Sequence, residues 1–275
     1  MEYMRSPKEN SLDAKIIEAL EKLAPSEKVV ETAALMTSDA EIQTIQEYAN
    51  NVSLIRLGFN DHGPVHMRIV VLNAITMMGL IREAGIKTSL ETEEVGTFWD
   101  SLSAVMFASM LHDVGMCVGR QDHEIHSSYL ATPIIDRILT KVYGDDLLHK
   151  RIMIRSLALE GIFGHMGNRT IHSLEAGIVQ IADGCDMTKG RARIPIALSY
   201  SPRAGDIHQY SASAIKEVRI SKGEERPICV QVFMTSEVGL FQVEEVLLSK
   251  IASSTAKGHI ELRAQVQDGE PKRYL

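Results

Sequence analysis

Apolar residues in the first 190 or so positions recur every three to four residues, the spacing of one face of an α-helix. Between residues 12 and 23, Ile16, Leu20 and Leu23 share a face, and Pro25 follows as a stop signal. The same spacing predicts further helices over 38–57, 65–81, 103–111, 122–139, 147–163 and 173–187. Because no segment here alternates as a strand does, we expect a helical domain.

Local signals place the ends of some of these helices. Residues 38–41 (SDAE) match a capping box that opens a helix. Gly58 interrupts the apolar pattern, and residues 60–64 form a polar loop that ends in proline. Since Pro64 suits the first turn of a helix, His66 is predicted to lie in that first turn, beside the loop.

The pattern changes after Arg193. Residues 199–212 are polar and rich in turn formers, as a linker or surface loop would be. The segments beyond it predict three strands at 215–220, 228–234 and 258–266, and an amphipathic helix at 240–252. We therefore predict a mainly α protein, with a helical domain over 1–198 and a small α+β domain over 199–275.

Amino-acid composition indicates which cellular compartment and which partners to expect. Of 275 residues, 45% are hydrophobic and 24% are charged. The net charge of −7 gives no indication that the protein binds nucleic acid or an anionic membrane. The cysteines at 117, 185 and 229 are scattered, which suits a reducing compartment. No run reaches about 18 apolar residues, and the N-terminus leads into charged sequence. We expect a cytoplasmic protein with no membrane partner, and nucleic acid is a disfavoured partner.

The most informative stretch is Met110–Gly115, where His112 and Asp113 end a long apolar run. Adjacent helical residues point about 100° apart, so these two side chains can converge only at a helix end or bend. Gly115 supplies such a bend. A buried carboxylate is costly unless it is paired or binds a cation, so the pair indicates metal.

Other polar residues near predicted helix ends could share that metal. In chain order the candidates are His66, His112, Asp113, His123, His126, His165 and Asp183. Helical bundles build metal centres in this way, with one or two ligands from each facing helix. Imidazole and carboxylate together suit Mn, Fe, Zn, Co or Ni better than Mg. Four ligands would hold one ion, and six would hold two that share an aspartate.

These residues resemble the H…HD…D signature of the HD-domain metal-dependent phosphohydrolases. Residues 123–131 are similar to the family segment that supplies a further histidine, and His165 falls where binuclear members place a fourth. Residues 181–188 (IADGCDMT) are similar to the family's "VAD…DAMT" segment. The resemblance covers about residues 55–195 and implies an HD-type helical bundle; the tail lies outside it.

The resemblance also implies two divalent transition-metal ions (Mn, Fe, Ni or Co, with Mg or Zn as options) bridged by Asp113. The core ligands would be His66, His112, Asp113 and Asp183. The second ion would bind His123 and His165, and His126, one helical turn from His123, is the alternative. Such a centre lowers the pKa of a bridging water, giving hydroxide that attacks a phosphate ester.

A small phosphorylated substrate would also need cationic side chains. Candidates flank the proposed ligands in sequence: Lys189, Arg191, Arg193, Arg56 and Arg68. Asp61 and His62, beside His66, could orient a ligand or act as general acid for the leaving group.

Differences between this sequence and the motifs of known branches of the family narrow the range of expected activities. The HD-GYP branch carries Lys after HDxG and a GYP motif, whereas this chain has Met116 and the sequence GHMGN at 164–168. This disfavours cleavage of cyclic di-GMP, and the site has fewer basic residues than the triphosphohydrolases. A phosphomonoester or nucleotide is the preferred substrate.

Two alternatives use the same ligands: a di-iron HD-type oxygenase, and a regulatory protein that binds metal or nucleotide. Exposed strand edges in the tail favour a homodimer.

Overall fold

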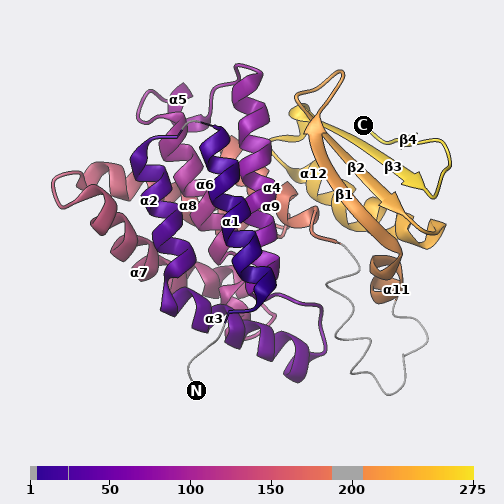
Figure 1. Cartoon of the computed structure of the whole chain (residues 1–275), viewed down its shortest axis with the longest axis horizontal. Coiled ribbons are helices and arrows are strands. Elements are labelled where there is room, and N and C mark those ends of the chain that lie inside the picture. The colour runs from indigo at the N-terminus through magenta and orange to yellow at the C-terminus, as the bar shows by residue number, and fades with distance from the viewer. Residues whose placement is uncertain (1–4, 24, 188–206) are drawn as a thin grey trace.

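The computed structural model describes residues 5–23, 25–187 and 207–275, and helices form the part before residue 188 (Figure 1). Their bounds are α1 Pro7–Lys22, α2 Glu27–Ser38, α3 Ala40–Asn51, α4 Pro64–Glu83, α5 Ser89–Thr92, α6 Phe98–Leu111, α7 His123–Tyr143, α8 Leu148–Gly164 and α9 Leu174–Gly184. This confirms the prediction of a helical first part. The pattern in the sequence did not reveal α2 or the short α5.

A mixed sheet follows, drawn in orange and yellow in Figure 1. The strands of this sheet are β1 Ile215–Lys222, β2 Ile228–Met234, β3 Ile260–Val266 and β4 Lys272–Arg273. The same part of the chain contains the helices α11 Ile207–Ala214 and α12 Leu248–Ser253. The strand order is β1-β2-β3-β4, with β2 and β3 parallel and the outer pairs antiparallel. The helical crossover between β2 and β3 is what a parallel pair requires. The predicted α+β character of the tail is confirmed.

Two predicted helices are divided in the structure. The helix expected over 38–57 begins at α3, where Asp39 accepts the main-chain N–H of Glu41 and Ile42, each at 3.1 Å. It continues as a π-helical segment, Val52–Leu57, and Gly58 ends it with a φ of 69°. The helix expected over 240–252 likewise has a π-helical part, Gln242–Leu247, before α12.

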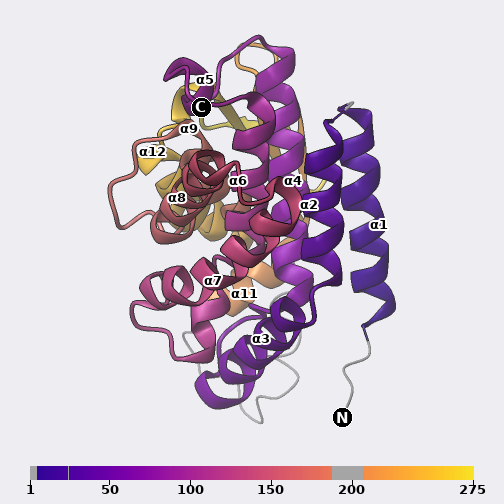
Figure 2. The ribbon, with the colours of Figure 1, turned by 90° about the vertical axis from the view of Figure 1, so that its left-hand side faces the viewer.

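The centre of the helical part is α4, which packs against α1, α6 and α9 (Figure 2). By length and composition alone, α4 could cross a membrane. Its buried side chains include Met67, Val70, Val71, Ala74, Ile75, Met77 and Met78. Because these residues lie in the protein core, packing accounts for the apolar composition of α4.

The predicted boundary between residues 198 and 199 falls in 188–206, outside the described residues, so the division into domains stays a prediction. The expected linker ends earlier than residue 212, since α11 begins at Ile207. Apolar side chains of β2 and β3 join the same core cluster as those of the helices. Among the described strands β1 pairs with β2 alone, and the homodimer also stays a prediction.

Candidate metal centre

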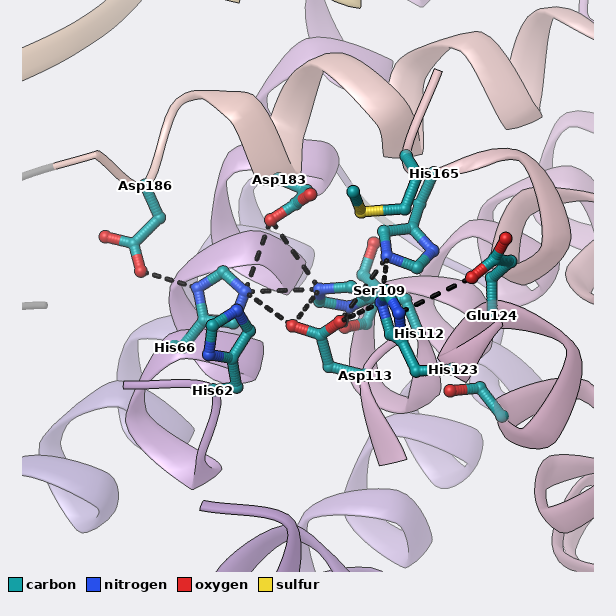
Figure 3. A network of polar contacts seen from close by, with 12 residues as sticks. His62, His66, Ser109, His112, Asp113, His123, Glu124, His165, Asp183 and Asp186 are labelled. Carbon is teal, nitrogen blue, oxygen red and sulfur yellow. Dashed lines mark hydrogen bonds and ion pairs between the residues drawn. The ribbon is translucent and has the colours of Figure 1, made fainter. Parts of the chain in front are cut away.

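Six buried side chains from five helix ends converge on one point (Figure 3). They come from the first turn of α4, the end of α6, the start of α7, the end of α8 and the end of α9. They are His66, His112, Asp113, His123, His165 and Asp183. Helices therefore bring together imidazoles and carboxylates that lie far apart in the sequence.

The turn after α6 gives His112 and Asp113 a shared direction. Asp113 leaves the helix with φ −104° and ψ 4°, and a short 3-10 turn, Val114–Cys117, follows. A Cβ on Gly115 would lie 2.5 Å from the Ser127 main-chain nitrogen and closer still to the carbonyl oxygen of His123. Only glycine lets α7 approach this turn so closely, so the bend expected at Gly115 is present.

The Asp113 carboxylate divides the imidazoles into two pairs. Its Oδ2 lies 3.4 Å from His66 Nε2 and 3.2 Å from His112 Nε2. Its Oδ1 lies 3.1 Å from His123 Nε2 and 3.4 Å from His165 Nε2. Each oxygen therefore faces its own pair of nitrogens, which is the arrangement of a carboxylate between two cation sites.

Asp183 belongs to the first pair. Its Oδ1 lies 3.2 Å from His66 Nε2 and 3.6 Å from His112 Nε2, whereas its Oδ2 forms an ion pair with Lys250 Nζ. One group thus contains two imidazoles and two carboxylates, and the other contains two imidazoles and the shared Asp113.

Hydrogen bonds fix the orientation of all four imidazoles. In His112, His123 and His165, the Nδ1–H donates to the main-chain oxygen three residues earlier, at 2.9, 3.0 and 2.7 Å respectively. In His66, the Nδ1–H donates to Asp186 Oδ2 at 2.7 Å. A carbonyl can only accept, so the proton is on Nδ1 and Nε2 faces the centre.

The donor set fits metal ions. His66 Nε2 lies 3.1 Å from His112 Nε2, and His123 Nε2 lies 3.2 Å from His165 Nε2. His165 is neutral and carries its proton on Nδ1, so its Nε2 lone pair faces His123 Nε2, and a cation between the two atoms would stabilise this contact. Neutral Nε2 and carboxylate oxygens are the ligands that transition-metal ions prefer. Overlapping sets of these residues could therefore hold metal ions.

The protein shifts the pKa values of this cluster in opposite directions. Burial acts to lower the pKa of His112, but the charges of Asp113 and Asp183 outweigh it and raise that pKa to about 9. Burial and the charge on His112 lower the pKa of His165 to about 4, against the pull of Asp113. Without metal, the cluster thus holds a proton on His112 rather than on His165.

The two carboxylates stay ionised. Burial alone would raise both pKa values, yet His112 and His62 hold the pKa of Asp113 well below its usual range. Lys250 and His112 do the same for Asp183. Both carboxylates are therefore anionic and ready to bind cations at neutral pH.

A cleft of about 560 Å³ opens beside Asp183 and Asp186. One wall is the loop before α4, including Phe59 and His62, and the other comes from the C-terminal part of the chain. Two cationic side chains line it, Arg120 and Lys250. The cluster therefore adjoins a space large enough for a small organic anion.

Comparison with known proteins identifies a relative of this chain. The chain is 37% identical over 236 residues to the uncharacterized protein MJ1020 of Methanocaldococcus jannaschii, covering 86% of this chain and 88% of that protein. The chain belongs to the MJ1020 family. No family model and no solved structure matches it. Because helices α1 to α9 lie within residues 7–184, a match of 236 residues extends into the C-terminal part, so the family shares more than these helices.

In this MJ1020-family chain, the predicted ligands meet with one exception. His126 joins neither group of ligand atoms, and His123 lies beside Asp113 instead. The His126 Nδ1 is buried without a hydrogen-bond partner among the described residues. Of the two histidines, His123 is the one whose Nε2 faces the cluster, at 3.1 Å from Asp113 Oδ1.

The residues before α4 have different places. His62 lines the cleft, and its Nδ1–H donates to the Asn60 main-chain oxygen at 2.6 Å. Asp61 Oδ1 accepts the Gly63 main-chain N–H at 2.8 Å, which shapes the loop. The expected role at the reacting centre is thus more compatible with His62 than with Asp61.

The predicted phosphate-binding cations that the structure describes do not line the cleft. Arg68 is fully buried, and its Nε donates to Asp13 at 2.7 Å, so this side chain supports the core and faces no cleft. Arg56 is exposed, donates to the Tyr48 hydroxyl at 3.3 Å and is not among the residues that line the cleft. The other three, Lys189, Arg191 and Arg193, lie outside the described residues.

Three residues of the site were not identified from the sequence as functional: Arg120, Asp186 and Lys250. Asp186 had a usable signal, since it lies one helical turn after Asp183. Lys250 had no such signal in the sequence, because it lies 67 residues after Asp183 and reaches the cluster only through the folding of the sheet and α12.

Proposed function

We propose that this chain is a metal-dependent hydrolase of a phosphate ester, of the HD-domain type, that works with two divalent transition-metal ions. The observation that carries the proposal is Asp113, whose two oxygens each face a separate pair of imidazole nitrogens. A single-ion site would not need a carboxylate between two such pairs. The order of motifs along the chain supports the same family.

One ion would bind His66, His112, Asp113 and Asp183, and the other His123, His165 and Asp113. Divalent ions at such a centre lower the pKa of water and neutralise charge on phosphoryl oxygens. The chain's own part is to hold the six ligands in place. The Nδ1–H bonds do this by fixing the orientation of each ring before any metal binds.

The cleft supports an anionic substrate of modest size. Arg120 and Lys250 line it close to the ligand cluster, and both can donate to phosphate oxygens. Its volume of about 560 Å³ suits a phosphomonoester or a mononucleotide. These features favour hydrolysis of a small ester over cleavage of a polymer.

His62 is the residue that we assign to proton transfer. Its Nδ1 proton is held by the Asn60 carbonyl, so Nε2 is the nitrogen that exchanges a proton with the leaving group. The His62 ring centre lies 6.0 Å from that of His66, which places it beside the metal centre without making it a ligand.

The direct test is phosphate release from a panel of phosphomonoesters and nucleotides. Protein stripped with a chelator would be reloaded with Mn, Co, Ni or Mg and assayed under air and under argon. We expect metal-dependent release of phosphate that is the same in both atmospheres. The activity should vanish in His112→Ala and persist in His126→Ala, a matched control because His126 lies outside the cluster.

Other outcomes would favour the alternatives. Turnover that requires oxygen and releases no phosphate would identify a di-iron oxygenase. Stoichiometric metal binding without turnover of any ester would indicate a regulatory protein.

A further inference from the structure

Lys250 reaches the metal centre from the C-terminal part of the chain. Its ammonium forms an ion pair with Asp183 Oδ2 and donates to the His165 main-chain oxygen at 3.0 Å. The side chain is only 11% exposed, yet it lines the cleft. This lysine thus contacts residues beside both proposed ions.

Close packing holds Lys250 in this place. A Cβ on Gly177 of α9 would lie 2.6 Å from Ser254 Oγ, which immediately follows α12. A Cβ on Gly184 would lie 3.1 Å from the Cδ of Lys250 itself. The two glycines are two helical turns apart on one face of α9, and the missing side chains at these two positions let α12 approach this seam closely.

Hydrogen bonds across the seam add to this packing. Ser254 Oγ donates to the Gly177 main-chain oxygen at 3.1 Å. Gln180 Nε2 donates to the Lys250 main-chain oxygen at 3.0 Å. The main chain of Lys250 is therefore tied to the helix that carries Asp183, and its ammonium has a fixed position at the centre.

The ammonium has donor capacity for a ligand. A lysine carries three N–H donors, and the contacts with Asp183 and His165 use two of them. Asp183 turns its Oδ1 toward the imidazoles and its Oδ2 toward Lys250, so metal binding and the lysine contact use different oxygens. Among the residues that the structure describes no partner takes the third donor, which points to a role for it with a group in the cleft.

We propose that Lys250 binds an anionic oxygen of the substrate, so that the C-terminal part of the chain completes the active site. This rests on the proposed function and extends it by naming a residue that binds the phosphate group beside the ions. The α+β part then contributes to which anions the centre accepts, because it supplies one of the two cations and one wall of the cleft.

Inorganic phosphate is the probe, added to the manganese-loaded full-length protein in isothermal titration calorimetry. A hydrogen bond to a charged group typically contributes enough for Lys250→Met to weaken phosphate binding about 10- to 100-fold. Lys250→Arg should restore most of the affinity, because it keeps the charge. Lys257→Met is the control, since Lys257 is exposed on the same part of the chain. Metal content should be equal in all four proteins.

Two results would overturn the proposal. One is phosphate affinity in Lys250→Met equal to that of the parent protein, or no phosphate binding by the parent at all. The other is a loss of bound metal or of folded helix in both Lys250 variants, which would mean a structural ion pair. Phosphate binding that depends on Lys250, without hydrolysis of any ester, would support the lysine's role while refuting the proposed hydrolase.

Discussion

Metal removal should make the stability of this protein fall as pH rises through the range where His112 loses its proton. In the metal-free protein, Asp113 and Asp183 overcome the effect of burial and raise the pKa of His112 to about 9. A histidine in the unfolded chain titrates near 6.5. The folded state therefore binds this proton more tightly, and its contribution to stability is complete only below pH 6.5.

The size of the effect follows from the same shift. A rise from 6.5 to about 9, at about 1.4 kcal/mol per tenfold change in proton affinity, corresponds to about 3 kcal/mol. Most of this contribution remains at pH 7, and nearly all of it is lost by pH 10. The folded state gains no compensating interaction, because neutral His112 faces His66 Nε2 at 3.1 Å.

Urea denaturation of chelator-treated protein between pH 6.5 and pH 10 measures this contribution. The comparison is with His112→Gln, which removes this imidazole and keeps the other titratable groups of the protein. The difference in unfolding free energy between the two proteins should shrink by about 3 kcal/mol across the range. A difference that stays constant with pH would refute the assignment of the proton to His112.

Two further substitutions test the supports of the site and of the fold. Asp186→Asn should weaken metal binding about 10- to 100-fold, because Asp186 orients the His66 ring through its Nδ1. Competition with a chromophoric chelator measures this, and unchanged affinity would contradict it. Asp39→Ala should lower the unfolding free energy by about 1–2 kcal/mol, since Asp39 caps α3 and binds Arg137 at 2.6 Å. Thermal and urea denaturation would show the loss, and a change under about 0.3 kcal/mol would argue against the cap.

Much of the buried His/Asp cluster could be predicted from the sequence because its residues leave a local trace. His112 and Asp113 stand at the end of an apolar run, where charged or polar side chains need a partner. His66 follows a loop and a proline that mark a helix start. The helical period likewise located most of the helices, although it did not distinguish the π-helical segments Val52–Leu57 and Gln242–Leu247 from α-helix.

The rest depended on tertiary structure. His123 and His126 are equivalent by spacing, and only the close approach of Gly115 to α7 places His123 beside Asp113. Arg68 lies near the site in sequence, yet it turns toward Asp13 in the core. Lys250 approaches through the packing of α12 on α9, and no local pattern records that contact. The cationic side chains that line the cleft are therefore harder to predict than the residues of the His/Asp cluster.

The central claim is that Asp113 joins two cation sites, and metal content measures it directly. Inductively coupled plasma mass spectrometry of the manganese- or cobalt-loaded protein should give two ions per chain. Asp113→Asn keeps the shape of the side chain but removes the anionic charge, so it should hold at most one. A parent protein that binds no transition metal, or an Asp113→Asn variant that still binds two ions, would contradict the account.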